Sequence, residues 1–224
     1  MLRLSRNIQK HTEALQLKDG SILQGELKDE NVHFLEHGVH FIANVIKGHK
    51  TGYFLDHRHN RKRVGELSKG KTVLDVFAYA GGFSVHALTH GAFEVTSVDI
   101  SEQALKIAIA NGELNTFSGK HKTLAGDAFQ ILQNLIAENK SFDVVVIDPP
   151  SFAKSAKEVP MALKKYAQVA ALGVKLTASK GLLVLASCSS RVPSEEFFSI
   201  NERMLHDSGR KFKVMDKTFH DIDH

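Results

Sequence analysis

The feature that most constrains the fold is an alternation, from Thr72 onward, of short apolar runs with amphipathic segments of helical length. This alternation is typical of parallel strands joined by crossover helices, because each helix returns the chain to the edge of the sheet where the next strand begins. The run from Phe142 to Ile147 is rich in β-branched residues and almost entirely apolar, as expected of a central strand covered on both faces. We therefore predict an α/β fold with a mostly parallel, twisted sheet and helices on both of its faces.

The same pattern places the individual elements. Strands are expected at residues 72–79, 94–100, 121–125, 142–147, 181–187 and 211–219. Helices are expected between them at residues 82–88, 101–111, 128–138, 159–178 and 194–208, with Ser101 as an N-cap.

The N-terminal part of the chain has a different pattern. Short alternating runs lie on either side of the pair His37-Gly38, which predicts a β-hairpin rather than another crossover unit. We therefore predict a small β-rich extension over residues 1–65 and a larger α/β domain over residues 66–224.

Composition excludes several classes of protein. No apolar stretch is long enough to span a bilayer and no secretory signal opens the chain, so a cytoplasmic protein without a membrane partner is expected. The single cysteine rules out an intramolecular disulfide and a zinc knuckle, and the 13 histidines are scattered, so no metal site is expected. The formal net charge of +4 permits a polyanionic partner without establishing one.

Acidic residues recur where the predicted strands end. Asp75 falls late in the first strand, Asp99 and Asp148 at the tips of the second and fourth, and Asp127 just after the third. Ligands of open parallel sheets bind beyond the carboxyl ends of the strands, so all four aspartates are expected to face one crevice. The alternative for each of them is a helix N-cap or a loop carboxylate.

The residues around these aspartates suggest an adenosine ligand. Gly81 and Gly82 allow positive φ and close approach to backbone, but neither dinucleotide-binding nor P-loop spacing is present. Asp99 is placed to accept hydrogen bonds from ribose hydroxyls. Asp127 is placed to accept one from an adenine amino group, with Ala128 and Phe129 beside the ring.

Four segments in order, 50–58, 75–83, 148–152 and 187–189, resemble the class I methyltransferases that form 5-methylcytosine in large-subunit ribosomal RNA, the bacterial 23S rRNA (cytosine-5) methyltransferase I family. The resemblance implies a Rossmann-like fold, S-adenosylmethionine as cofactor and RNA, specifically 23S rRNA, as partner; a homodimer is compatible with it. The cofactor set that we infer comprises Lys50, Tyr53, Asp56, Arg58, Asp75, Phe77, Tyr79, Gly81, Gly82, Phe83, Asp99, Ile100, Asp127, Ala128 and Asp148. Of these, Arg58 is expected to pair with the methionine carboxylate. The inferred substrate-binding residues are Pro149, Pro150 and Phe152.

Cys188 and Asp148 are the predicted catalytic residues. Carbon 5 of cytosine is a poor nucleophile, and addition of a thiolate at carbon 6 activates it. Cys188 follows the fifth strand and is expected within reach of Asp148, which would hydrogen-bond the base at N3 or at the exocyclic amine. The alternative for a lone cysteine after a strand is a small buried hydrophobic residue.

Two other functions remain open. An Asp-Pro-Pro loop followed by the aromatic Phe152 also suits methylation of a ring nitrogen or an amino group of a nucleobase. The second is a remnant that binds cofactor or RNA without catalysis, since the chain has no room for the N-terminal RNA-binding PUA domain of the family and stops where its last strand is expected. Cys188 favours carbon methylation.

Overall fold

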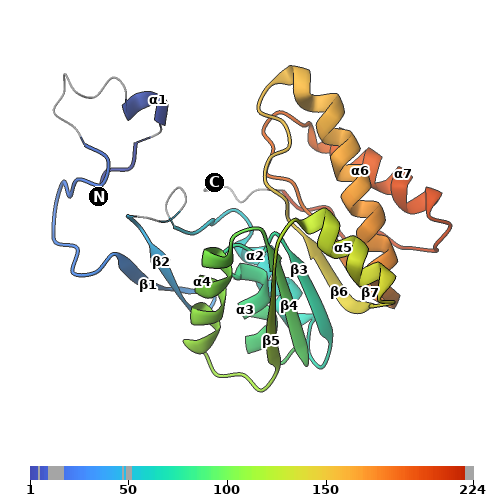
Figure 1. The fold of residues 1–224 in the computed structure, drawn as a ribbon, viewed down its shortest axis with the longest axis horizontal. Helices are drawn as coiled ribbons and strands as arrows, with labels where there is room; N and C mark the ends of the chain where they lie inside the picture. The colour runs from blue at the N-terminus through green and yellow to red at the C-terminus, as the bar shows by residue number, and fades with distance from the viewer. Residues whose placement is uncertain (5, 10–17, 47, 49–51, 220–224) are drawn as a thin grey trace.

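The computed structural model describes the whole chain except residues 5, 10–17, 47, 49–51 and 220–224. Its main sheet consists of five parallel strands in the order β5-β4-β3-β6-β7 (Figure 1). These strands are β3 (Thr72–Val76), β4 (Glu94–Asp99), β5 (Lys120–Ala125), β6 (Phe142–Ile147) and β7 (Thr177–Leu185). The helices are α1 (Arg6–Gln9), α2 (Arg58–Glu66), α3 (Gly82–Thr89), α4 (Glu102–Glu113), α5 (Ala128–Ala137), α6 (Val159–Leu176) and α7 (Ser194–Asp207), with a 3-10 turn, η2 (Ala156–Glu158).

Helices cover both faces of this sheet, which confirms the predicted α/β architecture (Figure 1). On one face α2, α3 and α4 pack together, and on the other α5 packs against α6, which in turn carries α7. The strand order reverses at β3, because β4 lies on one side of it and β6 on the other. A reversal of this kind opens a crevice at the carboxyl ends of the strands, which is the usual ligand site of such sheets.

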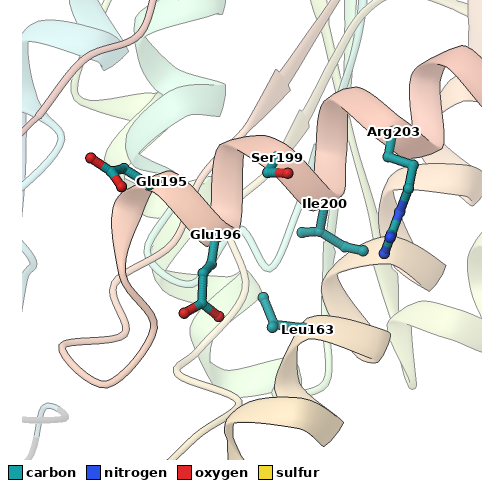
Figure 2. A pocket seen from close by; sticks show the side chains of 6 residues that line it. All are labelled: Leu163, Glu195, Glu196, Ser199, Ile200 and Arg203. Carbon is teal, nitrogen blue, oxygen red and sulfur yellow. The ribbon is translucent and has the colours of Figure 1, made fainter.

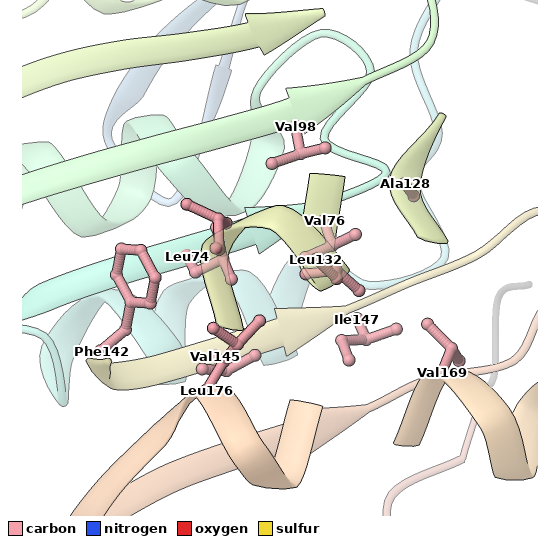
Figure 3. Close-up of a cluster of buried hydrophobic side chains, with 11 residues drawn as sticks. Leu74, Val76, Val98, Ala128, Leu132, Phe142, Val145, Ile147, Val169 and Leu176 are labelled. Carbon is pink, nitrogen blue, oxygen red and sulfur yellow. The ribbon is translucent and has the colours of Figure 1, made fainter. Parts of the chain in front are cut away.

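The apolar core fixes the positions of these strand ends. Leu74 of β3 and Val145 of β6 are fully buried and pack with Leu132 of α5 and Val169 of α6 (Figure 3). Burying an aliphatic side chain of this size contributes about 1.5–3 kcal/mol, so the cluster holds sheet and helices in one arrangement.

The predicted hairpin is confirmed. Antiparallel strands β1 (Asn31–Glu36) and β2 (Val39–Asn44) are joined by His37 and Gly38, whose φ values of 49° and 83° both lie in the left-handed region. Two-residue turns of this hand match the twist of a hairpin. The hairpin packs on the α/β core, because the β2 amides of His40 and Ile42 donate to side-chain oxygens of Asn115 and Asn111 at the end of α4. The division at residues 65 and 66, which falls in the last turn of α2, stays a prediction.

Two predicted strand boundaries are wrong by more than two residues. The first strand of the main sheet ends at Val76 instead of residue 79, because Phe77 and Tyr79 adopt left-handed φ values of 67° and 48°. The strand expected at residues 181–187 begins earlier, at Thr177, where α6 ends.

Residues 211–219 form no strand and are exposed, so the prediction of a strand there is also wrong. Alternating apolar residues specify a strand only where a neighbouring strand pairs with its backbone. Here the side chains contact helices instead: Thr218 accepts from Asn60 of α2, and Lys217 pairs with Glu202 of α7.

Candidate functional site

The site lies at the carboxyl edge of the main sheet, where the loops after β3, β4 and β6 meet. Asp99 ends β4 and Asp148 directly follows β6, as the sequence predicts. Both side chains are partly exposed. Their position at the reversal of strand order makes this edge the candidate ligand site.

Asp75 differs from the prediction that it faces the crevice. It is only 1% exposed, because it lies one residue before the end of β3 and its side chain is buried against α3. One carboxyl oxygen, Oδ2, accepts hydrogen bonds from the backbone amide and the hydroxyl of Ser84, at 3.0 and 2.6 Å. The other, Oδ1, is buried without a hydrogen-bond partner among the described residues. Burial raises the pKa of Asp75 to about 7, with Ser84 opposing the shift and Asp148 adding to it.

Asp99 has the geometry expected of a ligand-binding carboxylate. Its Oδ2 accepts from the backbone amide of Tyr79 and its Oδ1 from that of Ser101, both at 2.9 Å. A carboxylate has about four acceptor positions, so both oxygens can accept further bonds. The next residue, Ile100, is 77% exposed and offers an apolar surface beside the carboxylate. The predicted N-cap Ser101 is confirmed, since its hydroxyl accepts from the amide of Ala104.

Asp127 is the N-cap of α5, because its side chain accepts from the amide of Gln130 at 3.0 Å. A helix N-cap is the alternative role that the sequence left open for each of the four aspartates. Ala128 is only 4% exposed and packs in the core beside Leu132, and its predicted position beside a ligand ring stays a prediction. Ala128 is the first residue of α5 and lies on the buried, apolar face of this helix.

The glycine turn is required for packing between helices. Gly81 has a φ of 78°, and a Cβ placed on it would lie 2.7 Å from the Cβ of Ala108 in α4. A Cβ on Gly82 would lie 2.6 Å from the Cδ of Arg61. Phe83 is buried in the core, and its predicted role at the ligand stays a prediction. Phe77 and Tyr79 remain partly exposed on the same turn.

The predicted cofactor residues at and just before the start of α2 differ in their burial. Asp56 and Arg58 are partly buried, and the carboxylate of Asp56 faces the same histidine as Asp148. Tyr53 is 6% exposed and its hydroxyl donates to Glu36, and its predicted contact with a ligand stays a prediction. Lys50 lies outside the described residues.

A buried ionic network explains the burial of Tyr53, and the sequence did not predict it. Arg61 of α2 donates two hydrogen bonds of 2.7 Å to the carboxylate of Glu36 in β1, and His86 of α3 lies 3.0 Å from the same carboxylate. Burial acts to raise the pKa of Glu36, but the bonds from Arg61 and His86 outweigh it and lower the pKa to about 2. No local sequence signal marks these residues, since they belong to three elements.

The acidic loop and the cysteine loop are joined by hydroxyl groups. Ser151 donates to the hydroxyl of Ser189 at 3.1 Å, and the hydroxyls of Tyr166 and Ser187 lie 2.8 Å apart. These bonds fix the loop that carries Cys188 on both sides.

Cys188 is exposed, so the alternative of a buried hydrophobic residue is wrong. Its thiol lies 3.7 Å from the backbone oxygen of Pro149, the residue after Asp148. Pro150 is exposed beside it, and Phe152 is half-buried, with its ring 4.9 Å from that of Tyr166. The Cys188 thiol therefore lies beside the loop that carries Asp148, the other predicted catalytic residue.

Asp148 has a perturbed acidity. Burial raises its pKa to about 7, the negative charge of Asp56 adds to this, and Arg61 opposes it. The Nε2 of His57 lies 3.7 Å from Oδ1 of Asp148. The sequence did not single out His57, although it stands between the candidates Asp56 and Arg58. A carboxyl group that is partly protonated near neutral pH can either donate to a base or accept from it.

A surface hollow lies outside this site and shares no residue with it (Figure 2). It is lined by Leu163 of α6 and by Glu195, Glu196, Ser199, Ile200 and Arg203 of α7. In the described part of the chain, no cluster of three or more His, Cys, Asp or Glu side chains is arranged to hold a metal ion. No described helix is both long and apolar enough to cross a membrane.

A parallel sheet of this order, with acidic residues at its carboxyl edge and a glycine turn after β3, defines the class I, Rossmann-like methyltransferase fold. The sequence profile of the S-adenosylmethionine-dependent methyltransferases matches residues 18–190, and the chain belongs to this family. S-adenosylmethionine is therefore its cofactor.

Several curated relatives are similar over most of the chain. A "Ribosomal RNA large subunit methyltransferase" of Deinococcus radiodurans is 43% identical over 225 residues, covering 100% of this chain and 55% of the relative. A "Ribosomal RNA large subunit methyltransferase I" of Aeromonas salmonicida is 35% identical and covers 91% and 52%. The chain thus spans about half the length of these relatives.

Solved structures confirm the fold. A putative S-adenosylmethionine-dependent methyltransferase from Streptococcus mutans superposes with a TM-score of 0.80 at 27% identity, over 90% of this chain and 52% of that one. A putative methyltransferase complexed with SAH, the demethylated cofactor S-adenosylhomocysteine, gives a TM-score of 0.75 at 25% identity, over 90% and 53%.

Proposed function

We propose that this chain methylates carbon 5 of a cytosine in large-subunit ribosomal RNA, and that it does so through a covalent adduct on Cys188. The observation that carries the proposal is the exposed thiol of Cys188 beside the Asp148-Pro149 loop. The printed names of the Deinococcus and Aeromonas relatives support ribosomal RNA of the large subunit as the substrate.

The carboxyl edge fits the adenosine end of the cofactor. Asp99 has acceptor positions left for ribose hydroxyls, and Ile100 presents an apolar side chain for one face of adenine. The carboxyls of Asp56 and Asp148, which lie on either side of His57, favour a cationic ligand near them. Arg58 is the proposed partner of the methionine carboxylate. When bound, the cofactor supplies the methyl group.

Cys188 acts as the nucleophile. Its thiolate attacks carbon 6, which forms the C–S bond and shifts the electrons of the carbon 5–carbon 6 double bond toward carbon 5 and N3. After methylation, carbon 5 loses its proton to solvent and the C–S bond breaks, which restores the aromatic ring and the thiolate. The hydrogen bond between the hydroxyls of Ser151 and Ser189 supports this chemistry because it fixes the cysteine loop against the acidic loop.

Asp148 stabilises the charge that develops on the base. With its pKa raised to about 7, the carboxyl group holds a proton near neutral pH in part of the molecules. That proton is donated to N3 as the C–S bond forms, and it returns to Asp148 when the bond breaks. Pro149 and Pro150 restrict the backbone on one side of Asp148 and thereby limit its movement away from the base.

Methylation of a base nitrogen is the second candidate. Asp148 and Phe152 alone suit it, because a carboxylate accepts from an amino group and an aromatic ring stacks on a base. Phe152 is half-buried, its ring contacts that of Tyr166, and the ammonium of Lys165 lies over it, so the ring is less available for stacking on a base, which favours carbon methylation.

Release of tritium tests the proposal. Ribosomal RNA labelled with tritium at carbon 5 of cytosine is incubated with S-adenosylmethionine and the protein, its Cys188→Ala variant or its Ser190→Ala variant. Ser190 is exposed two residues from the thiol and serves as the matched control. We expect the parent and Ser190→Ala to release tritium and Cys188→Ala to release at least a hundredfold less. Methyl incorporation that survives in Cys188→Ala without tritium release would establish nitrogen methylation instead.

A further inference from the structure

His57 occupies a position between two carboxyl groups of the site. Its Nε2 lies 3.7 Å from Oδ1 of Asp148 and 3.9 Å from Oδ2 of Asp56. The three side chains are 13%, 26% and 12% exposed, respectively. Electrostatic contacts at this depth are screened much less than at the surface. The ring of Phe83 lies 6.2 Å from that of His57 and limits its movement on one side.

The other ring nitrogen determines where the imidazole carries its proton. The side-chain nitrogen of Asn60, one turn along α2, lies 3.1 Å from Nδ1 of His57 and 3.0 Å from the hydroxyl of Thr218. An amide nitrogen donates and does not accept, so Nδ1 accepts and the proton of neutral His57 is on Nε2. The N–H group is therefore on the side of the ring that faces the two carboxyls.

The charges around Asp148 define what this N–H group can do. Asp56 disfavours a negative charge on Asp148, and a charged Asp148 in turn disfavours one on Asp75. Arg61 favours that charge, but its guanidinium is bound to Glu36 and to the backbone oxygen of Phe54. An N–H group at Oδ1 stabilises the carboxylate form directly and fixes the orientation of the carboxyl group.

We propose that His57 is a positioning residue for methyl transfer, which holds the Asp148 carboxyl through Nε2–H and stabilises the carboxylate that remains after Asp148 gives its proton to N3 of the base. This inference rests on the proposed function. His57 keeps its own proton throughout, and the proton of Asp148 moves to N3 and back, so the cycle is balanced. In this proposal the separation of 3.7 Å shortens to a hydrogen bond when the base binds, as is common for catalytic contacts.

Two substitutions separate this role from a general structural one. His57→Gln retains an N–H donor of similar reach, and His57→Leu removes it. We expect His57→Leu to lower the rate of tritium release by about tenfold to a hundredfold with little change in affinity for S-adenosylmethionine, and His57→Gln to stay within about threefold of the parent. Loss of the donor also raises the pKa of Asp148, so the alkaline limb of the pH–rate profile moves to higher pH in His57→Leu. A merely structural defect lowers the rate at every pH and leaves the limb in place.

Nuclear magnetic resonance of the protein labelled with nitrogen-15 in histidine tests the contact without any turnover. The signals of His57 are those that His57→Gln lacks. We expect the Nε2–H tautomer in the parent, and a lower imidazole pKa in Asp148→Asn because a neighbouring negative charge is lost.

The rate measurements and the resonance titration distinguish failure of the His57 inference from failure of the proposed cytosine methylation. Signals of His57 that do not respond to Asp148→Asn, or a His57→Leu variant with parental rate and profile, would overturn the inference. If the parent binds S-adenosylmethionine but releases no tritium, the proposed cytosine chemistry fails and the resonance titration alone decides whether His57 and Asp148 interact.

Discussion

Asp75 combines complete burial with one carboxyl oxygen that lacks a hydrogen-bond partner in the described part of the chain. Burial raises its pKa from 3.8 to about 7, so between these values the folded protein holds a proton that the unfolded chain has lost. The free energy of unfolding of the ligand-free protein therefore falls as pH rises through this window. At 1.36 kcal/mol for each pH unit, the contribution of Asp75 is on the order of 4 kcal/mol.

The variant Asp75→Asn tests this pH dependence, because asparagine retains an acceptor oxygen for Ser84 and does not titrate. We expect urea denaturation between pH 5 and 8 to show a steep loss of stability in the parent and a shallower one in Asp75→Asn. The slope that remains includes Asp148, whose pKa is also raised to about 7. Asp127→Asn is the control, since asparagine is an equally good N-cap. Equal slopes in parent and Asp75→Asn would show that Asp75 is ionised in the folded protein.

At the scale of residues, the sequence predicted where candidates lie but not what surrounds them. Asp99, Asp148 and Cys188 could be placed because strand ends and the loops after them are visible in the hydrophobic pattern. Burial of Asp75 and Phe83 depends on which way a side chain points at a strand end or in the first turn of a helix, and a shift of one residue reverses that. His57 could not be found, because its contact with Asp148 joins residues that are distant in sequence.

At the scale of elements, the network of Glu36, Arg61 and His86 attaches the hairpin to the helices. Removing one member of a buried ion pair leaves the other charge uncompensated, at a cost of about 3–5 kcal/mol. We therefore expect Arg61→Met to lower the free energy of unfolding by this amount, measured by chemical denaturation. The double variant Glu36→Leu with Arg61→Met should recover much of the loss, because no buried charge remains.

Arg63 provides a matched control in the same helix. Its guanidinium pairs with Asp216, but the two side chains are 46% and 48% exposed. Exposed pairs contribute about 0–1 kcal/mol, so Arg63→Met should change stability by no more than that. A loss in Arg61→Met as small as that of Arg63→Met would show that the network does not hold the hairpin.

Elements that depend on neighbouring residues, such as turns and helix caps, could be predicted from the sequence. Elements that depend on pairing with residues distant in the sequence could not. The hairpin follows from His37-Gly38, and α4 follows from its Ser101 cap and its apolar periodicity. Residues 211–219 have the alternation of a strand but no strand beside them to pair with in the described structure. The start of β7 was missed because the helical pattern of α6 continues in the sequence to Ala178, while the register with β6 draws Thr177 into the sheet.

At the scale of the whole molecule, charge is distributed unevenly around the proposed site. The carboxyl edge carries Asp56, Asp99 and Asp148, whereas the segment after the acidic loop is basic. Exposed lysines follow that loop through η2 into α6: Lys154, Lys157, Lys164 and Lys165. An acidic crevice favours a cationic cofactor, and a basic border favours the phosphates of RNA.

Charge reversal on this basic border tests whether it contacts the RNA. Each lysine that neutralises a phosphate releases a counterion, which makes binding weaker as salt increases. We expect the double variant Lys154→Glu with Lys157→Glu to weaken binding of ribosomal RNA at least tenfold and to reduce the slope of log affinity against log salt by about two, roughly one for each contact. Lys120→Glu with Lys122→Glu introduces the same charge at the opposite edge of the sheet, where β5 begins, and should leave that slope unchanged. Affinity for S-adenosylhomocysteine, measured by calorimetry, should stay at the parental value in both variants, because neither pair lies at the carboxyl ends of β3 and β4. Equal losses of RNA affinity in the two variants would mean that net charge, rather than a defined face beside Asp148 and Cys188, attracts the RNA.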